Sequence, residues 1–235
     1  MAYKRILLKL SGEALMGAAG YGIDPETIGD VAEEMRDVRE AGVELAVVIG
    51  GGNIYRGMRA EKQGIDRVTG DYMGMIATVM NSLAMKARLE NLGLAVSIQS
   101  ALPVGNVVEP FVRRKAVRRL KEGRILIFAG GTGNPFFTTD TAAALRAVEV
   151  DAEVMLKATK VDGVYDKDPE AHGDAVFFPE ITYKEALRRG LAFMDATAIS
   201  LCMENGLPIV VFNLRKKGNL KRVVHGERTG TIVRG

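Results

Sequence analysis

Four short segments of this chain combine glycine with lysine, hydroxyl or amide side chains, which are groups that bind phosphate. They are residues 9–13 (KLSGE), 50–53 (GGGN), 130–135 (GGTGNP) and 157–163 (KATKVDG). Glycine lets backbone N–H groups approach an anion closely, and a helix that begins after such a loop adds a favourable dipole. One such loop would be weak evidence, but the set predicts a site for a ligand with many phosphates, or for two phosphorylated ligands together.

Other phosphate and metal chemistries lack their sequence signatures here. The P-loop pattern G-x-x-x-x-G-K-[ST] is absent, and no G-x-G-x-x-G follows a predicted strand. The two histidines, His172 and His225, lie outside any zinc-binding pattern. The single cysteine, Cys202, excludes a disulfide within the chain and fits a reducing, cytoplasmic environment.

Apolar runs alternate with amphipathic helical patterns from the beginning of the chain. We expect strands near residues 6–8, 45–49, 95–99, 125–128, 153–156 and 208–212, with helices between most of them. Asp24, Thr182 and Asp195 are expected to cap helices, and Asp140 is a further candidate for a cap. Continuous apolar strands separated by helices predict an α/β fold with a mostly parallel central sheet and helices on both faces. Ligands of such sheets gather at the carboxyl ends of the strands, where the glycine segments lie.

Composition and charge argue against nucleic acid and membrane partners. The 235 residues carry 32 basic and 29 acidic side chains, a net charge of +3, whereas a nucleic-acid-binding domain usually has a stronger and more clustered bias. Nowhere do about 18 apolar residues run together, as a membrane-spanning helix requires. The apolar segment near the start is too short for a secretory signal.

The four segments together resemble the amino-acid kinase fold family. The stretches KLSGEA (9–14), GGGN (50–53) and KATKVDGVY (157–165) are shared broadly across that family, while GTGNPFFTTD (131–140) resembles its bacterial uridylate kinase branch. The resemblance covers essentially the whole chain. It implies a three-layer sandwich in one domain, residues 1–235, with the acceptor bound roughly by 1–150 and ATP roughly by 151–235.

The same resemblance implies transfer of a phosphoryl group from ATP to UMP, giving UDP and ADP in pyrimidine nucleotide biosynthesis. It implies catalytic roles for Lys9, Arg56 and Asp140. The implied ATP-binding residues are Lys9, Leu10, Ser11, Gly12, Gly52, Arg56, Thr159, Tyr165 and Asp168. The implied UMP-binding residues are Gly51, Asp71, Thr132, Gly133, Asn134, Pro135, Phe136, Phe137, Thr138 and Thr139. Asp195 is a further acidic residue of the implied site.

Regulation and assembly are also implied by the family. The segment Gly17, Ala18, Ala19, Gly20, Tyr21 and Gly22 corresponds to a loop linked to activation by GTP. Inhibition by UTP, a homohexamer and Mg²⁺ held mainly through the ATP phosphates are expected on the same basis. A helical stripe of Met73, Ile76, Met80 and Leu83 is expected to be core or subunit interface.

Elementary chemistry agrees with a phosphate monoester as acceptor. Its second pKa is ~6, so it is largely ionised at neutral pH and needs no general base. The difficulty is repulsion between anions, which Lys9, Arg56, Lys157 and Mg²⁺ would offset. Asp140 is then better interpreted as an organiser of metal or lysine than as a base.

Several alternatives stay open from the sequence. A kinase of the same fold could act on a carboxylate or carbamate, and a nucleotide-sensing or storage protein could keep the fold without the chemistry. Residues 50–52 could form an ordinary turn, although three consecutive glycines favour close approach of a ligand. Asp71, Tyr165, Asp168 and Asp195 are more often structural on sequence alone, so their assignment rests on the resemblance.

Overall fold

A computed structural model describes residues 2–56 and 64–235 of the chain. Its main feature is a nine-stranded sheet in the order β4-β3-β5-β2-β1-β6-β10-β11-β9. The strands are β1 (Arg5–Leu10), β2 (Glu44–Ile49), β3 (Val96–Ser100), β4 (Glu109–Pro110), β5 (Ile125–Ala129), β6 (Val154–Thr159), β9 (Glu180–Thr182), β10 (Ile209–Asn213) and β11 (Thr231–Arg234). Two further short strands, β7 (Val164–Tyr165) and β8 (Phe177–Phe178), pair with each other.

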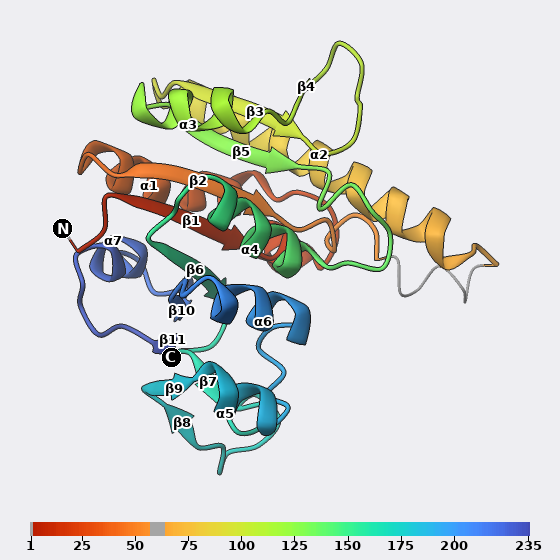
Figure 1. Ribbon diagram of the computed structural model, residues 1–235. Coiled ribbons are helices and arrows are strands. Elements are labelled where there is room, and N and C mark those ends of the chain that lie inside the picture. Colours follow the sequence, from red (N-terminus) through yellow and green to blue (C-terminus); the bar gives the residue numbers. More distant parts are fainter. Residues whose placement is uncertain (1, 57–63) are drawn as a thin grey trace.

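The sheet is mostly parallel, as predicted. In the main sheet of the described chain, β10 and β11 are the one antiparallel pair. Figure 1 shows β3 and β5 towards one end of the molecule, β1 and β2 in the middle, and β8 and β9 at the other end. The sheet therefore continues from the part of the chain before residue 150 into the part after it, through the neighbours β1 and β6.

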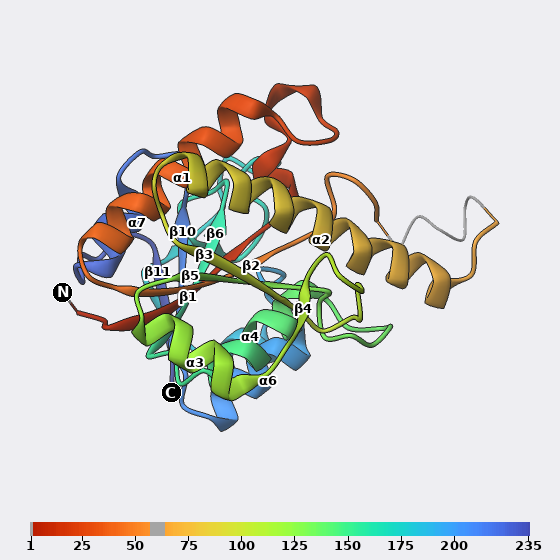
Figure 2. The ribbon, with the colours of Figure 1, turned by 90° about the horizontal axis from the view of Figure 1, so that it is seen from above.

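Helices cover both faces of the sheet, which confirms the predicted fold class. The helices are α1 (Pro25–Glu40), α2 (Arg67–Asn91), α3 (Arg113–Lys121), α4 (Thr139–Glu149), α5 (Tyr183–Arg188), α6 (Ala196–Glu204) and α7 (Asn219–Val224), with the 3₁₀ helices η1 (Gly12–Leu15) and η2 (Gly17–Ala19). Figure 2 shows α1, α2 and α7 on one side of the strands and α3, α4 and α6 on the other.

Strand periodicity divides the core into two. Ile6, Leu8 and Leu10 of β1 pack in the core shared with α1 and α2, while Leu7 packs in the core shared with α4 and α6. Alternate side chains of a strand point to opposite faces. Lys9 therefore projects on the same face as Leu7, towards α4.

The helix caps follow the sequence signals, with one exception. Asp24, Thr182 and Asp195 each accept a backbone N–H at the start of the next helix, as predicted. Asp140 is not a cap, because α4 begins earlier and the hydroxyl of Thr138 accepts the N–H groups of Asp140 and Thr141. Asp140 is thereby left in the first turn with its carboxylate available for other contacts.

The apolar stripe of α2 lies on the surface. The side chains of Met73, Ile76, Met80 and Leu83 are 36%, 55%, 50% and 38% exposed. This excludes the core alternative for these residues within the single chain. Over residues 2–56 and 64–235, none of the helices combines the length and apolar character that a membrane span needs.

Candidate active site

The centre of the sheet places two lysines side by side. Lys9 on β1 and Lys157 on β6 are partners in the parallel register of these strands. Neighbours in register point to the same face of a sheet, and Met155, two residues before Lys157, packs in the core beneath α4 and α6. Both lysines therefore project towards α4 from the carboxyl ends of their strands.

Asp140, in the first turn of α4, lies between the two amines. Lys9 Nζ is 2.7 Å from Asp140 Oδ1, and Lys157 Nζ donates to Asp140 Oδ2. The side chains of Lys9, Lys157 and Asp140 are only 7%, 12% and 13% exposed. An ammonium carries three donors, so each lysine can bind Asp140 and still donate to a phosphate oxygen.

The pKa values show which charges this cluster keeps. Burial opposes ionisation of Asp140, but the charges and hydrogen bonds of Lys9 and Lys157 outweigh it and lower the pKa to about 2. Burial lowers the pKa of Lys157, the carboxylate of Asp140 opposes this effect, and the charge of Lys9 adds to it. Asp140 is therefore a permanent anion at neutral pH, and it cannot act as a general base there.

A second carboxylate fixes the start of α4. Asp195, the cap of α6, accepts the hydroxyl of Thr141 and the N–H of Ala198, each at 2.9 Å. It also accepts the hydroxyl of Thr138, the cap of α4. Asp195 thus joins the first turns of α4 and α6 and holds the turn that carries Asp140. This gives the predicted site acid a structural contact with the cluster.

Close packing requires glycine at positions 12 and 51. A Cβ at Gly12 would lie 2.7 Å from the backbone nitrogen of Gly52, and a Cβ at Gly51 would lie 2.5 Å from the carbonyl oxygen of Gly74. Apart from the chain neighbours of Gly52, the nearest atom of the described residues to a Cβ at this position would be Nε of Arg56, at 3.6 Å. Packing therefore explains why position 51 is glycine, but it does not explain the glycine at position 52.

The predicted ATP-site residues near the start of the chain lie around η1. Ser11 caps η1 by accepting the N–H of Glu13 at 3.3 Å. Arg56 donates from Nε to the carbonyl of Gly52 at 3.3 Å, and its guanidinium pairs with Glu13. Ser11, Gly52 and Arg56 are thus brought together. The side chain of Leu10 lies in the core, so only its backbone is available to a ligand.

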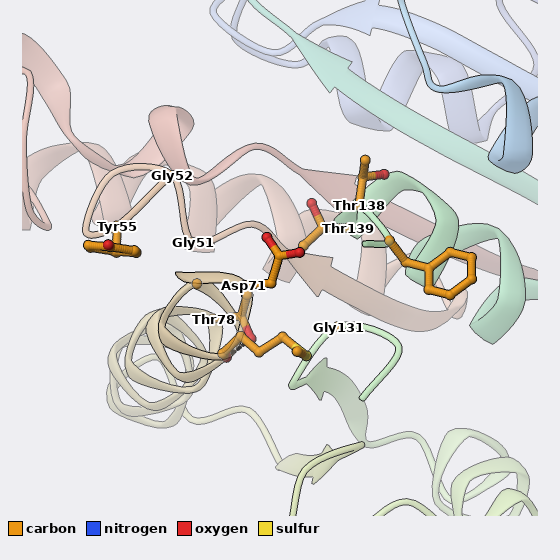
Figure 3. A pocket seen from close by; sticks show the side chains of 11 residues that line it. Gly51, Gly52, Tyr55, Asp71, Thr78, Gly131, Thr138 and Thr139 are labelled. Carbon is orange, nitrogen blue, oxygen red and sulfur yellow. Dashed lines mark hydrogen bonds between the residues drawn. The ribbon is translucent and has the colours of Figure 1, made fainter. Parts of the chain in front are cut away.

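A pocket of about 180 Å³ lies between α2, the glycine loop after β2 and the start of α4 (Figure 3). It is lined by the predicted acceptor-site residues Gly51, Asp71, Phe137, Thr138 and Thr139, and by Gly52, Tyr55, Gly74, Met75, Thr78 and Gly131. In Figure 3, Asp71 from α2 and Thr139 from α4 border the same space beneath the loop of Gly51. Lys9, Asp140 and Lys157 are not among the lining residues; the cluster is connected to the pocket through the first turn of α4, where Asp140 follows Thr139 in the chain.

Asp71 ties α2 to the loop that precedes α4. Its carboxylate accepts the backbone N–H of Phe136 at 2.8 Å and the Nε of Arg67 at 2.9 Å. Phe136 has φ 70°, a left-handed conformation that is rare for a bulky residue. The Arg67 guanidinium lies 5.9 Å from the centre of the Phe136 ring. Asp71 thus stabilises an unusual backbone conformation beside the pocket.

The rest of the predicted acceptor loop forms a turn outside the pocket lining. Thr132 Oγ1 accepts the N–H of Asn134 at 3.1 Å, and Gly133 donates to the carbonyl of Gly130 at 3.0 Å. Pro135 continues this turn towards Phe136. The structure therefore brings residues 137–139 to the pocket and leaves residues 132–136 outside its lining.

The other predicted ATP-site residues, Thr159, Tyr165 and Asp168, lie in a separate segment that begins at the end of β6. Thr159 donates to backbone carbonyls, including that of Phe212 at 3.2 Å. Tyr165 packs on Phe177 with ring centres 5.3 Å apart. Asp168 accepts the N–H of Glu170 at 3.0 Å. Each of these predicted residues has a structural contact of its own, and their joint role in ATP binding stays a prediction.

The predicted GTP-linked segment is attached to the glycine loop. The exposed segment from Gly17 to Gly22 includes η2, and Tyr21 is 68% exposed. Its last residue, Gly22, exchanges hydrogen bonds with Asn53, whose Nδ2 donates to the Gly22 carbonyl at 2.7 Å. The segment is thus connected physically to the loop after β2.

Comparisons with known proteins agree with this arrangement. Residues 4–213 match the model of the amino acid kinase family. The chain belongs to the amino acid kinase family. One similar solved structure is a UMP kinase from Bacillus anthracis, with a TM-score of 0.96, 37% identity and coverage of 100% of this chain and 97% of that chain. Another is a UMP kinase from Ureaplasma parvum, with a TM-score of 0.93, 36% identity and 100% coverage of both chains. A uridylate kinase from Archaeoglobus fulgidus is also similar, with a TM-score of 0.74, 26% identity and coverage of 97% and 99%.

This amino acid kinase has site residues that sequence reasoning did not assign. Lys157 was recognised as an available cation but was left out of the predicted site, although its register with Lys9 makes it part of the cluster. Met75 and Thr78 line the pocket from α2. The predicted helical pattern identifies which residues share a face of α2, but it does not indicate that this face borders a ligand.

Proposed function

We propose that this amino acid kinase transfers the γ-phosphoryl group of ATP to UMP, giving UDP and ADP in pyrimidine nucleotide biosynthesis. The observation that carries the proposal is the buried Lys9–Asp140–Lys157 cluster, whose Asp140 shares the first turn of α4 with Thr139 of the pocket. The choice of UMP as acceptor is supported by full-length similarity to UMP kinases at 37% and 36% identity.

The acceptor phosphate is its own nucleophile in this reaction. Its second pKa is ~6, so at neutral pH it attacks without giving a proton to the protein. One oxygen of UMP forms a bond to the γ-phosphorus in line with the breaking bond to the β,γ-bridging oxygen, and that oxygen leaves as part of ADP. No covalent enzyme intermediate is formed. The low pKa of Asp140, about 2, agrees with a site that needs no base.

The protein's task is to let two anions meet. Two unit charges ~4 Å apart repel by about 4 kcal/mol at an effective dielectric of 20, and several such pairs form here. Lys9 and Lys157 direct positive charge to one point because Asp140 orients both amines. Arg56, beside Gly52, supplies a further cation next to the glycine loop. Cations held in place before reaction stabilise the transition state without further reorganisation.

Mg²⁺ is proposed to enter with ATP. Both carboxylate oxygens of Asp140 lie next to lysine amines, which supports a role for this residue in orienting the lysines. The arrangement fits an ion held mainly by the ATP phosphates. When bound, the ion would neutralise phosphate charge in the transition state.

The ligand contacts are assigned as follows. ATP is proposed to bind to Lys9, Leu10, Ser11, Gly12, Gly52, Arg56, Thr159, Tyr165 and Asp168. UMP is proposed to bind to Gly51, Asp71 and residues 132–139. Within one domain, the acceptor is proposed to be bound roughly by residues 1–150 and ATP roughly by residues 151–235, with residues 9–12, 52 and 56 of the first part also contacting ATP.

Regulation, assembly and location are proposed together. GTP is proposed to activate through the segment from Gly17 to Gly22, whose attachment to Asn53 supports an effect on the glycine loop. UTP is proposed to inhibit as the end product that resembles the acceptor. A cytoplasmic homohexamer is proposed, and the exposed apolar stripe of α2 supports assembly.

An ADP-release assay over a panel of acceptors tests the proposed function. The panel contains UMP, CMP, amino-acid carboxylates and carbamate, each with ATP and Mg²⁺. We expect turnover with UMP to exceed turnover with every other acceptor. Preference for a carboxylate or carbamate would indicate a different kinase of the same fold. Nucleotide binding without turnover would indicate a sensing or storage protein.

A further inference from the structure

Two buried asparagines link the glycine loop to α2. Asn53 follows the loop after β2, Asn81 lies in α2, and their exposed fractions are 2% and 0%. Each amide donates to the other: Asn53 Nδ2 to Asn81 Oδ1 at 3.0 Å, and Asn81 Nδ2 to Asn53 Oδ1 at 2.7 Å. Burial of two amides is unfavourable unless their hydrogen bonds are made.

The second N–H of each amide binds a backbone carbonyl of a different segment. Asn81 Nδ2 donates to Gly50 at 2.7 Å, and Asn53 Nδ2 donates to Gly22 at 2.7 Å. All four N–H donors of the pair are therefore used, and each side-chain oxygen accepts one bond. A polar network satisfied in this way specifies one arrangement of the groups that it joins.

The same face of α2 also holds the second glycine loop. Thr78, one turn before Asn81, accepts the backbone N–H of Gly130 at 2.8 Å. Gly50 and Gly130 are the first residues of the two loops that border the pocket. Because Thr78 and Asn81 belong to one helix, α2 sets the distance between these loops.

The amide pair also contacts the lysine-bearing segment. A Cβ at Gly12 would lie 2.5 Å from Asn53 Oδ1, so the turn after Lys9 packs directly on this side chain. The carbonyl of Gly50 is held towards Asn81, which keeps a partial negative charge turned to α2. Three segments that form the site thus meet at one pair of buried amides.

We propose that Asn53 and Asn81 are positioning residues for phosphoryl transfer, which fix the glycine loop relative to α2 and to the Lys9 segment. This inference rests on the proposed function. The pair contacts no reacting atom; it acts through Gly50, Gly12 and Gly22. A displacement of about 1 Å in such a loop can lower the rate about 10²-fold.

The test uses three variants: Asn81→Ser, Asn53→Ser and the double variant that carries both of these changes. Each is compared with the control Ser82→Ala. Ser82 is the matched control, because it is equally buried in α2 and its hydroxyl donates within the same helix, to the Thr78 carbonyl at 2.7 Å. The readouts are kcat and KM for each nucleotide at 25 °C, together with Tm. Serine leaves room for a water molecule, so these variants are designed to fold.

We expect Asn81→Ser to lower kcat by roughly 10–10²-fold with a smaller change in KM, while Ser82→Ala keeps kcat within about twofold at a comparable loss of Tm. The double variant should lose no more than the worse single variant, because the two amides act as a unit. A folded Asn81→Ser variant with the kcat of the control would overturn the proposal. If Asn81→Ser does not fold, the kcat of Asn53→Ser is compared with that of Ser82→Ala, and equal values would overturn the proposal.

The proposed function can be wrong independently of the role of the asparagine pair. If the wild-type chain forms no UDP from UMP, the variants are compared by their Kd for ATP in calorimetry. Positioning predicts weaker binding of ATP for Asn81→Ser than for Ser82→Ala, because the glycine loop is no longer fixed to α2. Equal Kd values would then overturn the role of the pair.

Discussion

Lys9 Nζ and Asp140 Oδ1 are 2.7 Å apart in a largely buried ion pair, and the second oxygen of Asp140 accepts a hydrogen bond from Lys157. A single carboxylate thus bridges two buried amines, and the charge of Asp195 also acts on Lys157. Each ammonium has donors that Asp140 does not use, so an approaching phosphate can accept hydrogen bonds from both lysines.

Lys9→Ala is expected to lower kcat by roughly 10²–10³-fold, the scale for loss of one preorganised charge stabiliser. The fold should persist, because Asp140 keeps Lys157 as a partner. Steady-state ADP release measures the rate, and Tm reports the fold. Lys86→Ala is the matched control, since Lys86 is a partly exposed lysine on α2. Near-normal turnover in a folded Lys9→Ala variant would remove this amine from the catalytic site.

Asp140→Asn is expected to lower kcat while the fold and UMP binding are largely retained. The fold can persist because removal of the Asp140 charge lowers the pKa of Lys157 further, so this buried amine can give up its proton more easily. The remaining activity should therefore decline at a lower alkaline pH than the wild-type activity does. A profile of kcat between pH 7 and 10 on both proteins checks this. A variant with full activity and an unchanged profile would contradict the orienting role.

Asp140 also makes the free energy of unfolding depend on pH in the acid range. Its pKa is about 2 in the folded chain and 3.8 ordinarily, so its stabilisation is complete above the ordinary value and is lost as pH falls through about 2. The shift corresponds to about 2 kcal/mol of unfolding free energy. Urea unfolding at a series of pH values between 5 and 2 measures it. The wild-type chain should lose more stability over this range than Asp140→Asn, and parallel curves would contradict the prediction.

Local sequence signals predicted the elements better than the contacts between them. The alternation of β1 indicates that Lys9 shares a face with Leu7, and glycine-rich segments mark the carboxyl ends of the strands. The neighbour of Lys9 could not be predicted in this way, because the pairing of β1 with β6 joins distant parts of the chain. Threonine and aspartate both cap helices, so the true cap, Thr138, was missed in favour of Asp140.

Glycine itself gives an ambiguous signal. The sequence favoured ligand approach for the loop after β2, yet Gly51 is required by the carbonyl of Gly74, on α2. The reason lies in the packing of an element that follows later in the chain. The sequence therefore identified the loop as important and could not separate packing from binding.

Gly51→Ala and Gly52→Ala separate these two requirements. Gly51→Ala should lower Tm markedly, because its Cβ would lie 2.5 Å from the Gly74 carbonyl, whereas Gly52→Ala should leave Tm almost unchanged. If a nucleotide phosphate approaches the backbone of Gly52, Gly52→Ala should still lower kcat/KM by about tenfold or more, the equivalent of ~1.4 kcal/mol. Wild-type kinetics for Gly52→Ala would show that no ligand approaches this residue closely.

The outer face of α2 carries the last prediction. This helix departs from the usual amphipathic pattern: Thr78, Asn81 and Ser82 are buried together with apolar residues of the helix, while Ile76 and Met80 are about half exposed. An apolar stripe on an exposed helix face is typical of a protein interface.

Ile76→Glu and Met80→Glu should therefore dissociate the proposed homohexamer, because a carboxylate buried in an apolar interface is strongly unfavourable. Light scattering after size exclusion measures the mass, with a wild-type value expected near six times 25.4 kDa. Lys86→Glu, on the same helix and outside the stripe, should leave the mass unchanged. If both glutamate variants keep the wild-type mass, the stripe is not part of the interface. If they dissociate and also lose activity, α2 connects assembly to the loops held by Asn81 and Thr78.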